Sequence, residues 1–375
     1  MKKIVVAFDS FKGSLSSREA GEAFAMGYRE VVADADIRLF QISDGGEGLS
    51  EAIHSALGGE IVRCRVTDPL GRPIEATYAI VNGTTAVVSL AAASGLTLLT
   101  PEERNPLVAT TFGTGELILD AIARGCRRII VGLGGSATTD GGAGMLRALG
   151  YRFYDAEGEE LTESIDILER AVSVSDSAVK GEVRDVEIAV AVDVDNPLYG
   201  RRGAAYVFAP QKGATAEMVE RLDDALRHYA KLGDGYCGYE ASISAGVGAA
   251  GGVGYAFRAF MGRELTSGIE LLLDIIGFDA ELSDAMLVVT GEGRVDAQTL
   301  MGKAPSGVLR RATKYGVDCI AVGGCVEMSE ALKQSDFKAI YASMPETMSV
   351  DEAMQPSVAR ENLRRVGRLV AEGGK

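Results

Sequence analysis

The chain has 375 residues, more than one hydrophobic core usually holds, so we expect two domains. Its formal net charge of −15 disfavours nucleic acid and anionic membranes as partners, and no apolar stretch is long enough to span a membrane. The two histidines are too few for a histidine-rich metal site, and the five scattered cysteines predict a cytoplasmic protein with reduced thiols.

The chain alternates predicted strands and helices, which indicates an α/β fold with a mainly parallel sheet. A buried strand over residues 4–8 comes first, and the capping-box spacing of Ser16 and Glu19 marks the start of a helix. A second strand covers residues 37–42. The remaining predicted elements are strands over residues 128–131, 186–192, 285–290, 319–322 and 339–342, and helices over residues 145–149, 304–315 and 354–370.

The two strands at the front and the three at the back predict one doubly wound, five-stranded parallel sheet in the flavodoxin-like order 2-1-3-4-5. We therefore expect a discontinuous domain of residues 1–65 and 283–375, with a second α/β domain, residues 66–282, inserted into it. The turn Thr67-Asp-Pro-Leu-Gly71 would mark the entry to the insertion. Because ligands of open α/β sheets bind beyond the carboxyl ends of the strands, we expect the active site in a cleft between these domains.

The most informative segment is Gly132-Leu-Gly-Gly-Ser-Ala-Thr-Thr-Asp-Gly-Gly-Ala-Gly144, a glycine-rich loop between a predicted strand and a predicted helix. Its glycines, including Gly134 and Gly135, let the main chain approach a ligand closely. The free N–H groups and the helix dipole favour an anion, and the hydroxyls of Ser136, Thr138 and Thr139 add donors. The loop therefore predicts a phosphate site.

Two interpretations of this loop compete. Gly132 to Ala137 fits the pattern G-x-G-x-x-A, and Asp155 follows at about the distance of a ribose-binding acid, which would indicate an NAD(P)-dependent oxidoreductase acting on a small hydroxy acid. The loop lacks the GK[ST] of a P-loop, however, and it is richer in hydroxyls and acid than a dinucleotide loop. That composition favours a polyphosphate with a nearby Mg²⁺.

Similar turns of glycine and acid recur elsewhere, most of them after predicted strands. Any one of them can be a plain turn, since glycine and aspartate are favoured there for conformational reasons. Their number predicts a common ligand cleft. The turns are Asp9-Ser-Phe-Lys-Gly-Ser14, Asp44-Gly-Gly-Glu-Gly48, Thr111-Phe-Gly-Thr-Gly115, Asp193-Val-Asp-Asn-Pro-Leu198 and Gly291-Glu-Gly-Arg-Val-Asp296.

Phosphoryl transfer needs chiefly positioning and charge neutralisation, and the side chains for both are present. Lys12 and Lys303 are candidates to hold phosphate oxygens or a substrate carboxylate, or are solvated loop lysines. Asp193, at the end of a predicted strand, is either a general base for a substrate hydroxyl or a turn aspartate. Arg294 either clamps a carboxylate or pairs with its acidic neighbours. The candidate Mg²⁺ ligands are Asp44, Glu47, Glu292 and Asp296.

As an ordered set, these motifs resemble bacterial glycerate kinases of the type-1 family. The resemblance runs from Ile4 to beyond Gly324, nearly the full chain, and it implies two α/β domains, one of them flavodoxin-like with the other inserted. The motifs that carry it are Asp9-Ser-Phe-Lys-Gly-Ser-Leu-Ser16, Asp44-Gly-Gly-Glu-Gly48, the loop 132–144, Asn196-Pro-Leu198 after Asp193, Gly291-Glu-Gly-Arg-Val-Asp-Ala-Gln298 and Gly302-Lys303.

The resemblance implies ATP- and Mg²⁺-dependent phosphorylation of D-glycerate in glyoxylate or glucarate metabolism, with 2-phosphoglycerate favoured over 3-phosphoglycerate as product. A homodimer is a further expectation, and neither nucleic acid nor membrane is an expected partner. The expected roles are catalysis for Asp193 and Lys12, glycerate binding for Asp9, Ser10, Asp44, Arg294 and Asp296, nucleotide binding for Gly134, Gly135, Ser136, Thr138, Thr139 and Lys303, and Mg²⁺ binding for Asp44 and Glu292.

Three residues depart from the pattern of the family. Leu49 and Ala209 stand where threonine and glycine are commoner, and Asp195 adds a charge beside Asp193. None of them removes an expected catalytic group. A non-catalytic sensor of sugar acids is a third hypothesis, but a regulator of that kind needs a basic surface for nucleic acid, which the charge of −15 argues against.

Overall fold

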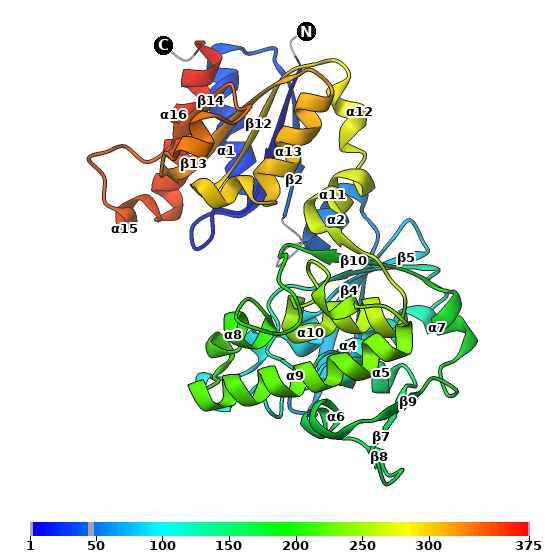
Figure 1. The fold of residues 1–375 in the computed structure, drawn as a ribbon. Helices are drawn as coiled ribbons and strands as arrows, with labels where there is room; N and C mark the ends of the chain where they lie inside the picture. The colour runs from blue at the N-terminus through cyan, green and yellow to red at the C-terminus, as the bar shows by residue number, and fades with distance from the viewer. Residues whose placement is uncertain (1–2, 44–48, 374–375) are drawn as a thin grey trace. The chain divides into compact units, whose positions relative to one another are not determined.

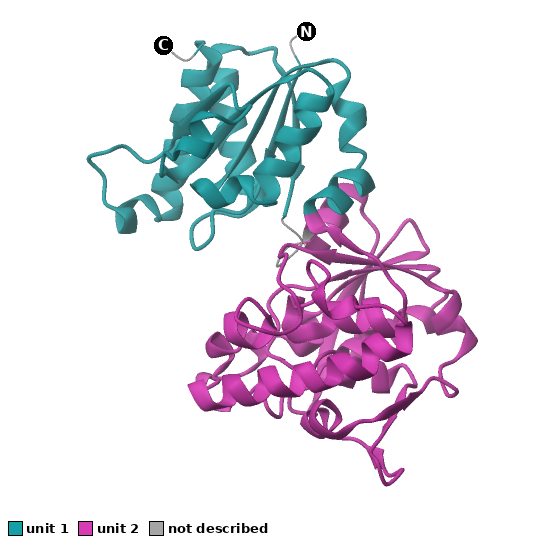
Figure 2. Ribbon diagram, in the orientation of Figure 1, with its two compact units in different colours: residues 1–44, 269–375 teal, residues 45–268 magenta. Residues whose placement is uncertain are grey.

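The computed structural model describes residues 3–43 and 49–373. The chain divides into two compact units, residues 1–44 with 269–375 (unit 1) and residues 45–268 (unit 2), coloured separately in Figure 2. The sequence placed the first crossing near residue 65. The structure places it earlier because the strand that ends at Thr67 belongs to the sheet of unit 2, where Thr67 to Gly71 form part of a hairpin connection.

Unit 1 is built on a five-stranded sheet with the order β14-β13-β12-β1-β2, in which every pairing is parallel. In chain order this is the flavodoxin-like arrangement 2-1-3-4-5, so the predicted fold class is confirmed (Figure 1). The strands are β1 (Lys3–Phe8), β2 (Asp36–Gln41), β12 (Ala285–Val295), β13 (Asp318–Val326) and β14 (Ala339–Ala342).

The helices of unit 1 cover a sheet in which strand β1, next to the central strand β12, is buried along its whole length. Ile4, Val6 and Phe8 of β1 join one hydrophobic core with α1 and α16. Val5 and Ala7 alternate with them and so point to the opposite face. The helices are α1 (Ser17–Val31), α11 (Gly268–Ile275), α12 (Phe278–Leu282), α13 (Ala304–Lys314), α14 (Glu330–Lys333), α15 (Val350–Ala353) and α16 (Pro356–Ala371).

Helix α1 begins where the sequence predicted. The hydroxyl of Ser16 accepts a hydrogen bond from the N–H of Glu19 (3.3 Å), and the Glu19 carboxylate accepts one from the N–H of Ser16 (3.0 Å), which completes the capping box. Further along, a Cβ at Gly27 would lie 1.8 Å from the carbonyl oxygen of Arg364 in α16. Only glycine at this position lets the two helices pack so closely.

Unit 2 contains a six-stranded mixed sheet with the order β11-β10-β6-β5-β4-β3 and a small antiparallel sheet with the order β8-β7-β9. The predicted strands over residues 128–131 and 186–192 are β6 and β10, which pair in parallel. The strands are β3 (Glu60–Thr67), β4 (Pro73–Val81), β5 (Thr85–Ser89), β6 (Arg128–Gly132), β7 (Arg152–Tyr154), β8 (Glu160–Leu161), β9 (Ser173–Ser175), β10 (Glu187–Val192) and β11 (Leu265–Ser267).

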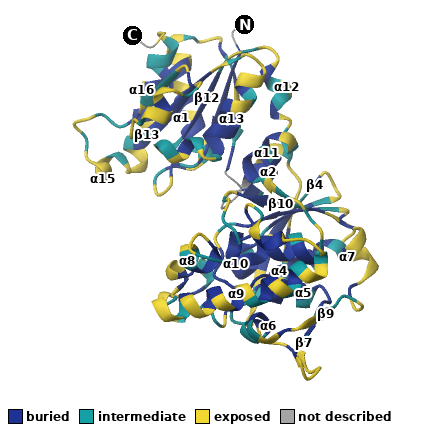
Figure 3. Cartoon of the chain, viewed as in Figure 1, coloured by how far each residue is buried: buried dark blue, intermediate teal, exposed yellow. Residues whose placement is uncertain are grey.

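The helices of unit 2 enclose a large hydrophobic core, and Figure 3 shows buried residues along the strands and the inner helix faces. The predicted short helix after the glycine-rich loop is α5. The helices are α2 (Leu49–Leu57), α3 (Ala91–Ser94), α4 (Phe112–Ala123), α5 (Ala143–Ala148), α6 (Ser164–Arg170), α7 (Gly181–Asp185), α8 (Ala204–Phe208), α9 (Ala216–Cys237) and α10 (Ala249–Tyr255).

One predicted turn is wrong. Gly291 to Val295 were expected to leave the sheet, but β12 continues through them and stays paired with β13, with Glu292 opposite Gly323 and Arg294 opposite Cys325. A Cβ at Gly291 would lie 2.1 Å from the carbonyl oxygen of Val322, so the glycine permits close strand pairing here rather than a turn.

Other features agree with the bulk composition. All five cysteines are free thiols, as predicted. Among residues 3–43 and 49–373, no helix is both long and apolar enough to cross a membrane.

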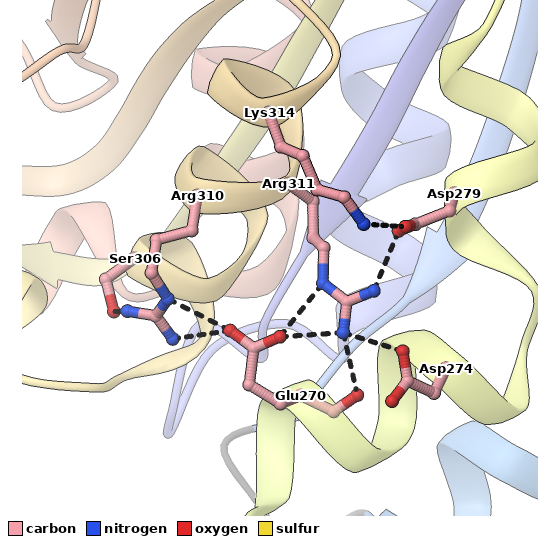
Figure 4. A network of polar contacts seen from close by, with 7 residues as sticks. All are labelled: Glu270, Asp274, Asp279, Ser306, Arg310, Arg311 and Lys314. Atoms are coloured by element: carbon pink, nitrogen blue, oxygen red, sulfur yellow. Dashed lines mark hydrogen bonds and ion pairs between the residues drawn. The ribbon is translucent and has the colours of Figure 1, made fainter.

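A cluster of ion pairs holds α11 and α12 against α13 (Figure 4). These two helices come directly after the chain returns from unit 2 to unit 1. The Arg311 guanidinium lies 2.7 Å from a Glu270 carboxylate oxygen, 2.7 Å from Asp274 and 2.9 Å from Asp279. Arg310 bonds the other Glu270 oxygen at 2.7 Å. The Arg311 side chain is only 13% exposed, so its three acidic partners compensate a charge that is largely removed from water.

These contacts also set the protonation of the acids. Burial alone would raise the pKa of Glu270, but hydrogen bonds from Arg310 and Arg311 outweigh it, and the pKa is lowered. The pKa of Asp279 is lowered in the same way by Lys314 and Arg311. Folding lowers the pKa of both acids, so the stability that their ionised forms contribute is present at neutral pH. This stability is lost as the pH falls below about 4, the ordinary pKa of a carboxyl group, and through the lowered pKa values.

Arg311→Leu should destabilise the protein by about 2–3 kcal/mol at pH 7, because it leaves three carboxylates without their common partner. Urea unfolding at pH 7 and at pH 3.5 would measure the effect, and the difference from the parent protein should shrink at the lower pH as the acids become protonated. Arg360→Leu, which removes an exposed pair with Glu19, is the control and should barely move the midpoint. An Arg311 variant no less stable than this control would contradict the argument.

Candidate functional site

A pocket of about 820 Å³ lies in unit 1 at the carboxyl ends of four parallel strands. Residues at or just beyond the ends of β1, β12, β13 and β14 line it, together with residues from the start of α13 and from α15 and α16. It contains seven of the residues that the sequence singled out, namely Asp9, Ser10, Lys12, Glu292, Arg294, Asp296 and Lys303.

The segment after β1 brings three of them together. Asp9 is 7% exposed, its N–H bonds the carbonyl oxygen of Gly291 at 2.9 Å, and its carboxylate accepts a hydrogen bond from the N–H of Ser10 at 2.6 Å. The chain then turns back, with the N–H of Phe11 bonded to the carbonyl oxygen of Leu15 at 2.9 Å. This places Lys12 exposed at the tip of the turn, with its side chain accessible to an anion.

Glu292, near the end of β12, is linked to Lys303, the residue just before α13. Thr299 donates its hydroxyl hydrogen to one Glu292 oxygen at 2.7 Å and accepts a hydrogen bond from the N–H of Asp296 at 3.0 Å. The other Glu292 oxygen lies 3.8 Å from the Lys303 ammonium. The carboxylate of Asp296 also caps the short helical turn 297–300 by accepting from the N–H of Gln298 at 2.8 Å.

Two further sequence predictions concern Arg294, which lines this pocket, and the acids Asp44 and Glu47. Arg294 pairs with Glu327 and lies 3.4 Å from Asp296, so in this structure it neutralises acidic neighbours. Asp44, predicted to bind glycerate and Mg²⁺, and Glu47 lie outside the described residues.

A second pocket, of about 320 Å³, lies in unit 2 next to the glycine-rich loop. Gly134, Gly135 and Ser136 line it, together with Asp193 from the end of β10. The structure thus brings the predicted phosphate loop and the predicted general base into one pocket. Among the described residues, no backbone hydrogen bond is donated by the N–H groups of residues 134, 135 and 136, so all three can serve a ligand.

Lys212 also lines this pocket and was missed by the sequence analysis. It is 2% exposed, and its ammonium donates hydrogen bonds to the Ser136 hydroxyl (2.8 Å) and to the carbonyl oxygen of Thr138 (2.6 Å). Burial lowers the pKa of Lys212 to about 7, against the opposing field of Asp140. A third ammonium hydrogen remains for a ligand, and a bound anion would stabilise the charge.

The shape of the loop depends on Asp140, the second residue that the sequence analysis missed. Its buried carboxylate accepts hydrogen bonds from the N–H (2.8 Å) and hydroxyl (2.7 Å) of Thr111 and from the N–H groups of Gly142 (3.1 Å) and Gly144 (3.2 Å). Burial raises the pKa of Asp140, and the four donors, which favour the carboxylate, offset only part of the rise. Through its hydrogen bonds to Thr111, Gly142 and Gly144, the Asp140 side chain joins the start of α4 to the start of α5.

The remaining loop residues differ in their access to a ligand. Thr138 and Thr139 are completely buried, and their hydroxyls have no hydrogen-bond partner among the described residues. The main chain at Gly251 packs directly over them, since a Cβ there would lie 2.1 Å from the carbonyl oxygen of Thr138. Asp193, in contrast, is exposed. The neighbouring Asp195 forms an exposed pair with Arg202 at 3.3 Å, which balances the extra charge noted in the sequence.

Lys212 and Asp140 left only weak signals in the sequence. Lys212 belongs to the run Pro210-Gln-Lys-Gly213, which has no distinctive pattern of its own, and it is 76 residues from Ser136. Asp140 stands among glycines, where aspartate is usually a turn residue. In both cases the function depends on burial, which the local pattern does not reveal.

The structure gives no support to the dinucleotide interpretation. Asp155, the expected ribose-binding acid, closes a tight turn by accepting from the N–H groups of Glu157 (3.2 Å) and Glu159 (2.9 Å), and it pairs with Arg170 at 2.6 Å. It does not line the pocket that contains the glycine-rich loop. Asp155 is a structural residue.

The fold and the two pockets define an α/β protein that binds small anionic molecules. The Glycerate kinase family matches residues 4–373. A protein of Bacillus subtilis (strain 168) named glycerate kinase is 42% identical over 371 residues, which cover 98% of this chain and 97% of the relative. A protein of Escherichia coli (strain K12) named glycerate 2-kinase is 41% identical over 371 residues, with the same coverage.

A solved structure agrees with these matches. The crystal structure of a Salmonella typhimurium LT2 protein, described as a candidate glycerate kinase 2, superimposes with a TM-score of 0.86 and 43% identity, covering 99% of this chain and 98% of that one. The chain belongs to the glycerate kinase family. This assignment favours the kinase over the oxidoreductase hypothesis.

Lys212 should make catalytic efficiency depend on pH. Its ammonium is the form that binds an anion, so kcat/KM should fall as the pH rises through about 7. The stability of the fold should change in the opposite direction. Because folding lowers the pKa of Lys212, the folded chain holds fewer protons than the unfolded chain between about pH 7 and 10.5. The free energy of unfolding therefore rises with pH over that range. If kcat/KM falls with pH while stability rises, the loss of efficiency comes from weaker ligand binding by Lys212 and not from unfolding.

Lys212→Met should reduce kcat/KM by roughly 100-fold or more and remove this step from the pH profile. Lys231→Met, at an exposed position of α9, is the matched control and should keep the parent profile. A Lys212→Met protein that retained the step near pH 7 would assign the titration to another group. Initial rates from pH 6 to pH 9 are the measurement.

Proposed function

We propose that this protein transfers the γ-phosphoryl group of ATP to a hydroxyl group of D-glycerate. Its family membership makes it a kinase with ATP as co-substrate. The observation that supports the chemistry most directly is the unit 2 pocket, which Lys212 and Asp193 line together with residues 134–136, whose N–H groups donate no backbone hydrogen bond among the described residues. Phosphoryl transfer depends chiefly on such positioned charge.

In the proposed reaction, the Asp193 carboxylate accepts the proton of the glycerate hydroxyl as its oxygen attacks the γ-phosphorus. A new oxygen–phosphorus bond forms, the bond to the bridging oxygen of ADP breaks, and the electron pair stays on the ADP phosphate. The N–H groups of residues 134–136 and the ammonium of Lys212 stabilise the charge that is spread over the transferred oxygens.

Mg²⁺ is part of this proposal. Asp9, Glu292 and Asp296 line the unit 1 pocket with carboxylate oxygens, the ligands that Mg²⁺ prefers besides phosphate. Among residues 3–43 and 49–373 no group of three or more potential metal-binding side chains is preformed, which fits a metal that completes its shell with water and phosphate oxygens. When bound, Mg²⁺ neutralises phosphate charge; Glu292, and Asp44 beyond the described residues, are its proposed ligands.

Several finer sequence predictions stay proposals. Membership of the type-1 bacterial group is supported by bacterial relatives, and the name of the Escherichia coli protein supports the 2-hydroxyl of glycerate as acceptor. The five free thiols support a cytoplasmic location. The homodimer remains a prediction, as does glycerate binding by Asp9, Ser10, Arg294 and Asp296.

The purified protein should consume ATP only when both D-glycerate and Mg²⁺ are present, and phosphorus NMR of the product should show 2-phosphoglycerate. Omitting each component in turn is the control. A signal of 3-phosphoglycerate would overturn the regiochemistry but not the activity, whereas the absence of glycerate-dependent ATP consumption would overturn the proposed function itself.

Asp193→Asn should lower kcat by about 100-fold or more, because the amide cannot accept the hydroxyl proton, while the affinity for ATP should change little. Asp195→Asn, two residues away and equally exposed, is the control and should remain close to the parent in kcat. Steady-state kinetics and nucleotide titrations would measure both. Similar kcat values for the two variants would remove Asp193 as the base.

A further inference from the structure

The unit 1 pocket has the position at which doubly wound sheets bind their ligands. In the sheet of unit 1, β2 lies on one side of β1, and the later strands β12, β13 and β14 follow on the other side. The strand order therefore reverses between β1 and β12. Asp9 follows β1, and Glu292 lies near the end of β12, so the pocket covers this switch point. The pocket extends from there past the ends of β13 and β14, where Cys325 and Met344 line it.

The size of this pocket exceeds what glycerate requires. Its volume is about 820 Å³, whereas the unit 2 pocket measures about 320 Å³. Volumes toward the upper part of the range of about 300–1,000 Å³ are typical of pockets for ligands much larger than a three-carbon acid. Of the two substrates in the proposed reaction, ATP is the large one.

The lining also suits a molecule with an aromatic part and a charged part. Beside the charged residues described above, the pocket has an apolar lining that includes Met328, Met344, Val350 and Met354. Met328 is 48% exposed and Met354 41% exposed, so these side chains form apolar surface that is accessible from the pocket. Methionine sulfur packs well against aromatic rings.

Polar and apolar lining meet at Met354. A Cβ at Gly13 would lie 2.8 Å from the terminal methyl of Met354, so this side chain packs on the turn that carries Lys12. Asn362 of α16 also lines the pocket and is 7% exposed, and within the described part of the chain its amide donates to the weakly accepting sulfur of Met348, at 3.5 Å. Its amide is thus a suitable partner for a ring nitrogen or a ribose oxygen.

We propose that the unit 1 pocket is the nucleoside-binding site, with the base of a purine nucleoside triphosphate on the methionine-lined side and the phosphates toward Lys12 and Lys303. The inference rests on the proposed kinase activity, and it extends the sequence prediction, which assigned nucleotide binding chiefly to residues 134–139 of unit 2.

The test is a calorimetric titration of the full chain with ADP in the presence of Mg²⁺. Met354→Glu and Met328→Glu, which put a charge where the base would pack, should each raise the Kd of ADP by about tenfold or more. In kinetic assays they should raise the KM for ATP and leave the KM for glycerate within about twofold. Met26→Glu, at an exposed methionine of α1 away from the pocket, is the control and should match the parent.

Circular dichroism of each variant would show whether the fold is intact, and two independent substitutions at exposed positions guard against a misfolded variant. Parent-like ADP affinity in both folded pocket variants would overturn the nucleoside site while leaving the kinase activity standing. Weakened ADP binding in both, without glycerate-dependent ATP consumption by the parent protein, would support the nucleoside site and overturn the proposed acceptor instead.

Discussion

The buried carboxylate of Asp140 is the interaction on which the unit 2 site depends. It gathers four donors from two separate segments of the chain, and through them it fixes how the glycine-rich loop enters α5. The hydroxyl of Thr111, one of those donors, also accepts the N–H of Met145 at 2.9 Å, so the beginnings of α4 and α5 share one polar junction. In a loop held in this way, the N–H groups of residues 134–136 donate no backbone hydrogen bond within the described part of the chain.

The buried charge of Asp140 also explains how Lys212 can be accommodated. An isolated ammonium in a protein interior is expensive, and burial indeed lowers its pKa to about 7. The field of Asp140 and the two oxygens that accept from the ammonium offset part of that cost. An anionic ligand would supply the rest of the compensation, which is a physical reason for an anion to bind at this pocket of an acidic protein.

The two units contribute different kinds of site. In unit 1 the parallel sheet ends in a broad pocket whose charged groups are already engaged with each other, such as Lys303 with Glu292 and Arg294 with Glu327. In unit 2 the pocket is small, and among the described residues the N–H groups of residues 134–136 donate no backbone hydrogen bond. A broad pocket with apolar lining suits recognition of a large substrate, whereas a small pocket with unpaired donors suits stabilisation of charge during a reaction.

The sequence by itself predicted the doubly wound fold of unit 1 and the capping of α1, both of which the structure confirms, because hydrophobic periodicity and capping spacing can be read from the chain. It also predicted an anion site at residues 132–144 from their glycine content, and this stays a prediction. It did not reveal the continuation of β12 through Gly291, which depends on pairing with β13. Only the tertiary structure decided that Lys212 and Asp140 belong to the site, because their roles arise from burial and from contacts across 76 and 29 residues of chain. It also decided that Arg294 pairs with nearby acids and that Thr138 lies beneath the main chain at Gly251. Such outcomes follow from packing between distant segments, which no local pattern encodes.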